Sequence, residues 1–225
     1  MKLLISDFEG TLVDFQWKLR ESMDEMCEII KGYNINYDLN LPIERLKNFN
    51  YSKLYNYFQK NIEEPMLKKK IMKDFDRIYD FYDMDAAKRW KLKQNVPEIL
   101  KKLSEQNVKL ALCSNVGRKA LDIVTEKMKI KKFFDITVSR NDVKFLKPNI
   151  NGIKYIFTYF QITNTNKHKI FFLGDSVTDI HTAKKSNIPA IIITDQGENS
   201  LSEIERHLPE HIVHNIDDVQ LFFHN

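Results

Sequence analysis

The sequence predicts an α/β fold in which a doubly wound parallel sheet is interrupted by a helical insertion. Two observations lead to this prediction. Short, continuous apolar runs alternate with helix-like stretches over the second half of the chain, whereas the region from about Val13 to Lys88 has no strong strand signal. Alternation of strands and helices is typical of a parallel sheet with helices on both faces.

Five apolar runs have the composition of buried strands. They are nearly continuous in Val, Ile, Leu and Phe, as expected where helices cover both faces of a sheet. We therefore predict strands over Lys2–Ser6, Val108–Cys113, Ile136–Val138, Lys169–Leu173 and Ala190–Thr194.

Four stretches between these strands have helical periodicity. In the first of them Pro97 stands at the start and apolar residues recur at helical spacing. The predicted helices cover Pro97–Glu105, Arg118–Lys127, Ile150–Phe160 and Asp179–Ser186. Strands and helices together predict a Rossmann-like core made of residues 1–12 and 89–225.

Residues 13–88 predict a separate helical cap inserted after the first strand. Trp17–Ile30 and Pro65–Tyr82 have the pattern of amphipathic helices, and half of the chain's 26 aromatic residues lie in this region. One aromatic set is interpreted as packing between cap helices, with a roof over an apolar substrate as the alternative; its members are Tyr51, Tyr55, Tyr57 and Phe58. The cap is expected to close over the core and to select the substrate.

Composition excludes several classes of function. The net charge of +4 is mild and calls for no nucleic acid, although it suits anionic substrates. No segment approaches the roughly 20 apolar residues that span a bilayer, and the apolar run before Asp7 is too short for a signal peptide. The two cysteines, Cys27 and Cys113, form no metal or redox motif. We expect a cytoplasmic protein with no membrane partner and no nucleotide cofactor.

Four short polar motifs follow the predicted strands or precede a helix. They are Asp7–Leu12, Ser114-Asn115, Lys147-Pro148 and Gly174–Asp179. Open α/β sheets bind ligands at the carboxyl edge of their strands, so these motifs are expected to converge there. Gly10 allows the chain to leave the first strand in a tight turn.

The residue types in these motifs suit phosphoryl transfer. A carboxylate nucleophile such as Asp7 divides a difficult hydrolysis into formation and breakdown of an acyl phosphate. Mg²⁺ prefers hard oxygen ligands, which Asp7 and Asp175 could supply from neighbouring strand ends. Ser114, Asn115 and Lys147 offer a hydroxyl, an amide and an ammonium to the oxygens of a negatively charged phosphoryl group.

The order and spacing of the four motifs resemble the haloacid dehalogenase superfamily, and within it the phosphoglycolate-phosphatase-like group with a helical cap. The family pattern is Asp-x-Asp-Gly-Thr, then Ser or Thr, then Lys, then Gly-Asp-x-x-x-Asp, and this chain follows it over nearly its whole length. The resemblance implies that Asp7 is the nucleophile and a metal ligand. It implies that Glu9 is the general acid and base and gives its backbone carbonyl to the metal.

The remaining motifs also receive roles from the resemblance. Ser114 would hold the phosphoryl oxygens and Lys147 would bridge the nucleophile and the phosphate. Asp175 would bind Mg²⁺ directly, with Asp179 in its first or second coordination shell. Asn115 stands where many relatives position the substrate or the nucleophile.

Glu9 is a departure from the pattern, which usually has a second aspartate there. Glutamate keeps the same acid–base chemistry, but its extra methylene adds about 1.5 Å of reach and requires another rotamer or a wider site. Enolase-phosphatases are similar at this position, so glutamate is compatible with activity.

The sequence predicts a Mg²⁺-dependent phosphatase acting on a small phosphorylated metabolite. Two alternatives stay open: a phosphomutase acting on sugar phosphates, and a degenerate scaffold that binds a partner protein through its aromatic cap. Dehalogenation fits less well, because it requires no metal and would leave Asp175 and Asp179 without a role. Phosphoglycolate, sugar phosphates and nucleoside monophosphates are all open as substrates, and the sequence predicts no oligomeric state.

Overall fold

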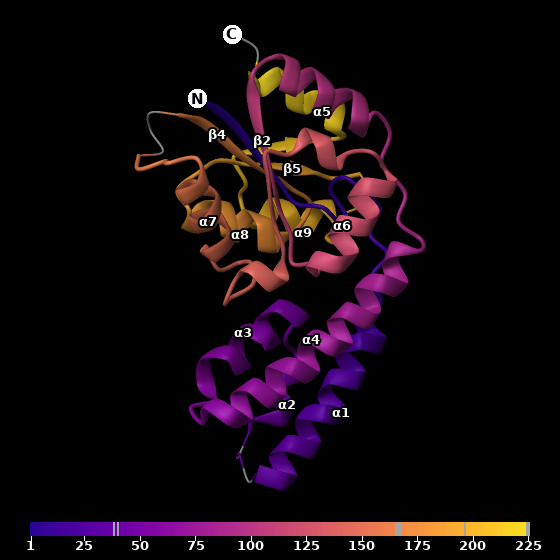
Figure 1. Ribbon diagram of the computed structural model, residues 1–225, viewed down its shortest axis with the longest axis vertical. Helices are drawn as coiled ribbons and strands as arrows, with labels where there is room; N and C mark the ends of the chain where they lie inside the picture. The colour runs from indigo at the N-terminus through magenta and orange to yellow at the C-terminus, as the bar shows by residue number, and fades with distance from the viewer. Residues whose placement is uncertain (38, 40, 165–167, 196, 224–225) are drawn as a thin grey trace.

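The computed structural model describes residues 1–37, 39, 41–164, 168–195 and 197–223. Its centre is a six-stranded sheet in the order β3-β2-β1-β4-β5-β6, and every neighbouring pair is parallel (Figure 1). The α/β fold predicted from the sequence is confirmed. The strands are β1 (Lys2–Ser6), β2 (Val108–Cys113), β3 (Ile136–Val138), β4 (Lys169–Gly174), β5 (Ala190–Ile193) and β6 (His211–Val213).

Helices cover both faces of this sheet because alternate residues of each strand point to opposite sides. Leu4 and Leu112 belong to one buried cluster, whereas Leu3 and Ile5 belong to another. The first cluster includes residues of α5, α6 and η4, and the second includes residues of α7, α8 and α9. These elements are α5 (Val96–Glu105), α6 (Arg118–Lys127), α7 (Asn151–Tyr159), α8 (Val177–Lys185), α9 (Leu201–Arg206) and η4 (Ile216–Phe223).

The edge strand β6 was not among the predicted strands. It has only three residues, begins with a half-buried histidine and has an exposed second residue, so it lacks the continuous apolar run of the central strands. Two short 3₁₀ helices, η1 (Lys131–Phe133) and η2 (Arg140–Asp142), flank β3 and were also not predicted.

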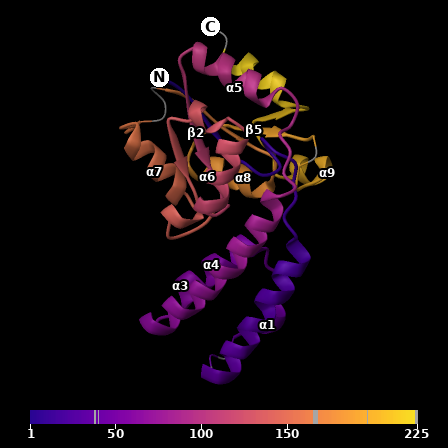
Figure 2. The same cartoon turned by 45° about the vertical axis from the view of Figure 1, so that its right-hand side comes forward.

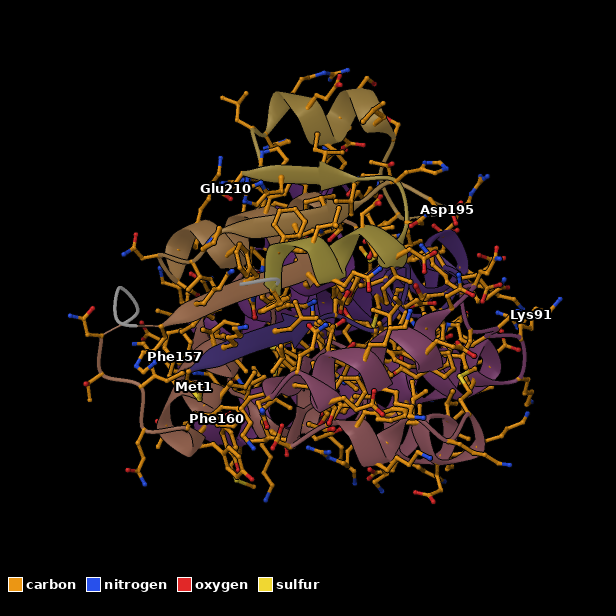
Figure 3. All side chains as sticks on the ribbon, turned by 90° about the horizontal axis from the view of Figure 1, so that it is seen from above. Met1, Lys91, Phe157, Phe160, Asp195 and Glu210 are labelled. Atoms are coloured by element: carbon orange, nitrogen blue, oxygen red, sulfur yellow. The ribbon has the colours of Figure 1, made fainter. Side chains whose placement is uncertain are left out.

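The two ends of the strands lie on opposite sides of the core. Met1 and Glu210, which precede β1 and β6, lie on one side in the view from above, whereas Asp195, which follows β5, lies on the other (Figure 3). Lys91, in the segment that returns from the helical insertion, lies on the same side as Asp195. The insertion therefore leaves and rejoins the core at the carboxyl edge of the sheet.

Four helices between β1 and α5 form a lobe beyond this edge (Figures 1 and 2). We call these four helices the cap. The predicted helix Trp17–Ile30 begins later and extends further than expected, and the helix predicted at Pro65–Tyr82 continues toward the core. The helices are α1 (Leu19–Tyr37), α2 (Ile43–Leu46), α3 (Tyr51–Asn61) and α4 (Pro65–Ala87).

The cap has an aromatic core of its own. Phe58 and Phe75 lie 5.2 Å apart between ring centroids, and Tyr55 stacks on Tyr79 at 6.0 Å. All four side chains are buried. Tyr55 and Phe58 of the predicted aromatic set therefore pack within the cap, whereas Tyr51 and Tyr57 are half-buried. Among the described residues, no helix is both long and apolar enough to cross a membrane.

Candidate active site

The predicted site residues converge at the carboxyl edge of the sheet. β1 is paired in register with β2 on one side and β4 on the other, so the ends of these strands lie level. Asp7 follows β1, and its backbone N–H donates to the carbonyl of Leu173 in β4 at 2.8 Å. One pocket is lined by five of the predicted residues, namely Asp7, Glu9, Ser114, Asn115 and Lys147.

Lys147 is the cation at the centre of this site. Its Nζ lies 2.8 Å from Asp7 Oδ1 and 2.7 Å from Asp179 Oδ1, and its side chain is only 5% exposed. Burial alone would lower the pKa of Lys147, but the charges of Asp179 and Asp7 raise it well above its usual value. The ammonium is therefore held as a charged group between two carboxylates.

A third carboxylate, that of Asp175, lies close to the two that contact this ammonium. Oxygens of Asp7, Asp175 and Asp179 lie within 4.8 Å of one another. Burial, with smaller effects of the neighbouring charges, raises the pKa of Asp7 to about 6. Burial and repulsion from Asp179 and Asp7 raise the pKa of Asp175 well above its usual value. The cluster thus carries more negative charge than Lys147 balances.

This donor set fits a hard divalent cation. Mg²⁺ is bound in proteins by one or two carboxylates together with water and substrate oxygens, and a cation would lower the raised pKa values of Asp7 and Asp175. Asp7, Asp175 and Asp179 could hold such an ion, and the ion would balance the excess charge of the cluster. The Glu9 carboxylate is not part of this group among the described residues, and a role for its backbone carbonyl stays a prediction.

Hydrogen bonds fix the carboxylates of Asp175 and Asp179. The Thr11 hydroxyl donates to Asp175 Oδ1 at 2.7 Å, and the Glu198 backbone N–H donates to Asp175 Oδ2 at 2.7 Å. Asp179 Oδ2 accepts from the Ser176 hydroxyl at 2.7 Å, within a capping box at the start of α8. The hydrogen bonds that cap the N-terminus of α8 therefore also hold the Asp179 carboxylate in the site.

Glu9 lies at the junction between the core and the cap. Its Oε1 accepts three hydrogen bonds, from the backbone N–H groups of Gln16 and Trp17 at 2.8 and 2.7 Å and from the Trp90 indole at 2.8 Å. Gln16 and Trp17 precede α1, and Trp90 follows α4. The Glu9 carboxyl therefore binds both chain segments that link the core to the cap. Burial raises the pKa of Glu9 to about 8 despite these donors, so the group is mostly protonated at neutral pH.

Asn115 supports the lysine loop. Its Oδ1 accepts from the Lys147 backbone N–H at 2.9 Å, and its Nδ2 donates to the Lys147 carbonyl at 3.3 Å. The Ser114 side chain is buried and lines the pocket beside it. Direct contact of Ser114 and Asn115 with a substrate stays a prediction, whereas the contact of Asn115 with Lys147 is observed.

Comparison with known proteins agrees with this geometry. Residues 4–193 match a family model described as haloacid dehalogenase-like hydrolase, which includes the strands that carry Asp7, Ser114 and Asp175. The chain belongs to the haloacid dehalogenase-like hydrolases. It is therefore an enzyme of a hydrolase family, as the four motifs predict.

Relatives of this hydrolase are distant in sequence. A phosphoglycolate phosphatase of Photorhabdus laumondii is 23% identical over 97% of this chain and 91% of its own length. The pyrophosphatase PpaX of Oceanobacillus iheyensis is 22% identical, over 97% of this chain and 95% of its own length. A crystal structure of a predicted phosphoglycolate phosphatase from Haemophilus somnus superposes with a TM-score of 0.66 at 22% identity, covering 100% of this chain and 98% of that one.

The cap of this haloacid dehalogenase-like hydrolase is docked on the site loops through α3. The Asn56 side chain donates to the Leu146 carbonyl at 2.9 Å and accepts from the Leu146 backbone N–H at 2.8 Å. Further along α3, Gln59 donates to the Lys144 carbonyl at 3.1 Å. The loop that carries Lys147 is therefore held by amide side chains from both sides, Asn115 in the core and Asn56 in the cap.

The pocket also contains polar residues outside the predicted site, among them Tyr51, which the sequence analysis interpreted as cap packing with a roof over the substrate as the alternative, and Glu198. Tyr51, at the first position of α3, lines the pocket, and its hydroxyl lies 3.4 Å from Asn115 Nδ2. Glu198, in the loop after β5, lines the pocket on another side. Burial, with repulsion from Asp179 and Asp7, raises the pKa of Glu198 to about 7. Neither residue stands in a strand-end motif, whereas Thr11 and Ser176 lie inside two motifs and could have been found there.

Proposed function

We propose that this hydrolase is a phosphatase that releases phosphate from a small phosphate monoester, with Asp7 as the nucleophile and Mg²⁺ as its metal ion. The observation that supports this most directly is the arrangement around Asp7. Its carboxylate follows the central strand and lies 2.8 Å from the buried Lys147 ammonium, within a cluster of three carboxylates. A protonated acid two residues along the chain, Glu9, lines the same pocket.

In the first half-reaction an oxygen of Asp7 attacks phosphorus. The bond between Asp7 and phosphorus forms while the bond to the leaving oxygen breaks, and Glu9 gives its proton to that oxygen. Lys147 offsets the repulsion between the carboxylate and the incoming dianion. The Ser114 hydroxyl donates to the phosphoryl oxygens as their charge changes.

In the second half-reaction Glu9, now a carboxylate, takes a proton from water as the water oxygen attacks phosphorus. The bond between phosphorus and Asp7 breaks, and phosphate leaves. This sequence returns Glu9 to its protonated form, so one group serves both steps. The raised pKa of Glu9 suits this alternation, because it lies near neutral pH.

Mg²⁺ would be held by Asp7 and Asp175, with Asp179 and the backbone carbonyl of Glu9 as further ligands. When bound, it would offset the negative charge of the transferring group. Lys147 would hold the Asp7 carboxylate in place for its roles as nucleophile and metal ligand. Asp175 is fixed from two sides by Thr11 and the backbone of residue 198.

We propose residues 13–88 as a cap domain and residues 1–12 and 89–225 as the catalytic core domain. The docking of α3 on the site loops supports a cap that excludes water from the aspartyl phosphate. In this conformation the free volume of the pocket is about 20 Å³, which holds about one water molecule. The cap or the side chains must therefore move for a substrate to enter.

A reducing compartment such as the cytoplasm would suit this enzyme. Cys27 and Cys113 are both free thiols, and Cys113 is buried at the end of β2 beside the site. Small phosphorylated metabolites in the same compartment would be its substrates.

The test is release of inorganic phosphate from p-nitrophenyl phosphate and a panel of phosphorylated metabolites, with Mg²⁺ and with EDTA. We expect release only with Mg²⁺, and none from Asp7→Asn, which is nearly isosteric. After an acid quench during turnover, mass spectrometry should find one phosphoryl group on the peptide that contains Asp7.

Three outcomes would contradict the proposal. Retained turnover in Asp7→Asn would remove Asp7 as the nucleophile. Transfer of the phosphoryl group to a sugar phosphate, with little release to water, would instead indicate a phosphomutase. A folded, Mg²⁺-binding protein that processes no ester would favour a scaffold that only binds.

A further inference from the structure

The pocket has two parts that differ in chemistry. Asp7, Ser114 and Lys147 face the position of the phosphoryl group. The rest of the lining, which would face the leaving group, includes Phe15, Tyr51, Val116, Thr178 and Glu198. Because these side chains line the same pocket as Asp7, they would contact the leaving group once the pocket has opened to admit a substrate.

The pocket offers no free cation to a second negative group. Among the described residues that line it, Lys147 is the one basic side chain, and both Asp7 and Asp179 already bind its ammonium. The nearby Arg140 lines no part of the pocket, and its guanidinium is surrounded by Asp76, Asp80 and Asp83 of α4. A carboxylate or a second phosphate on the leaving group would therefore be buried without a partner, which is costly.

Glu198 adds a further carboxyl group to the pocket lining. Its backbone N–H is bound to Asp175 at 2.7 Å, and the neighbouring Gly197 packs so closely that a Cβ there would lie 2.8 Å from Asp175 Cβ. Residue 198 is thus fixed against the carboxylate cluster and cannot withdraw without disturbing it. Tyr51 lines the same pocket as a neutral phenol, since burial and then the charge of Glu198 raise its pKa well above the usual value.

We propose that Glu198 selects a leaving alcohol that carries a hydrogen-bond donor, hydroxyl or ammonium, and that has no negative charge. The donor would bind the Glu198 carboxyl, with the Tyr51 hydroxyl beside it. This inference rests on the proposed phosphatase function and narrows its substrate class. It separates this chain from relatives named for phosphoglycolate and pyrophosphate, whose leaving groups are anionic.

Three esters of equal length test this inference: 2-hydroxyethyl phosphate, phosphoethanolamine and phosphoglycolate, which release ethylene glycol, ethanolamine and glycolate. At pH 8.0 with Mg²⁺, kcat/KM should be at least about tenfold higher for the first two than for phosphoglycolate. Glu198→Gln should lower kcat/KM for phosphoethanolamine and raise it for phosphoglycolate, narrowing their ratio by about tenfold or more. Glu205→Gln, which removes the same charge from an exposed position on α9, should leave the ratio unchanged.

Binding separates this inference from the proposed reaction. Calorimetry on Asp7→Asn with Mg²⁺ gives the dissociation constants of the same esters without turnover, and their order should match that of kcat/KM. If no ester is hydrolysed but this order of binding holds, the phosphatase proposal fails and the selectivity of Glu198 stands. If phosphoglycolate is bound and hydrolysed as well as 2-hydroxyethyl phosphate, or if Glu198→Gln changes no ratio, the selectivity is overturned and the phosphatase stands. Failure of all three esters to bind would also overturn it.

Discussion

Arg140 and Asp83 form a buried ion pair that joins the core to the cap. Arg140 Nη1 lies 2.7 Å from Asp83 Oδ2, and the two side chains are 1% and 4% exposed. Arg140 also donates to the Asn115 carbonyl at 3.2 Å, and Asp83 accepts from the Gly117 backbone N–H at 2.8 Å. The pair therefore fixes α4 against the loop that carries Ser114 and Asn115.

Arg140→Ala should destabilise the protein by about 3–5 kcal/mol, because removal of one partner leaves buried carboxylates of α4 without a counter-ion. Urea unfolding measures the change. Arg118→Ala is the matched control, since Arg118 pairs with Asp142 at a half-exposed position and its loss should cost about 1 kcal/mol or less. Equal losses in the two variants would mean that burial of the Arg140 pair contributes little to stability.

Glu9→Gln should lower kcat by roughly 10² or more while the protein stays folded. The amide oxygen of glutamine can still accept the hydrogen bonds from Gln16, Trp17 and Trp90, but the amide cannot donate a proton to a leaving oxygen. Steady-state kinetics and a thermal unfolding curve separate the two effects. An unchanged kcat would mean that another acid protonates the leaving group.

The pH dependence of kcat/KM should have a descending limb near pH 8. Burial raises the pKa of Glu9 from 4.5 to about 8, and the first step needs this group protonated. The rate should therefore fall as the pH rises through about 8. In Glu9→Gln the limb should disappear, because the amide does not titrate. If the limb persists in that variant, it belongs to a different group.

Much of the core could be predicted from the sequence because its strands are fully buried. Continuous apolar runs gave five of the six strands, and the proline at residue 97 marked the start of α5. The edge strand β6 escaped because it is short and half exposed. The sequence did not predict α2 and α3 of the cap as separate helices. Their boundaries depend on local N-terminal capping residues such as Asn50, whose side chain accepts a hydrogen bond from the Lys53 backbone N–H at 2.9 Å.

The strand-end residues could be predicted because their position follows from the topology. Asp7, Ser114 and Asp175 meet wherever β1, β2 and β4 are neighbours. Tyr51 and Glu198 could not be predicted in this way, because they reach the pocket only through the docking of α3 and the path of the loop after β5. Such contacts have no local sequence pattern, and they are the ones that would select a substrate.

Gly10→Ala should abolish activity and destabilise the protein, and it tests how tightly the turn after β1 is packed. Gly10 has φ of +79°, and a Cβ there would lie 2.2 Å from Asp175 Oδ2. The added methyl must displace either the turn or the Asp175 carboxylate, so metal affinity and kcat should fall together. Mg²⁺ titration and phosphate release measure both.

Gly32→Ala is the matched control for this substitution. Gly32 lies inside α1, and a Cβ there would meet no atom within 4 Å. Alanine in a helix interior is more favourable than glycine, so this variant should be more stable by about 0.5–1 kcal/mol with unchanged activity. Full Mg²⁺ binding in Gly10→Ala would show that the Asp175 carboxylate can shift without loss of the site. The acidic cluster would then be less constrained than the hydrogen bonds of Asp175 to Thr11 and residue 198 indicate.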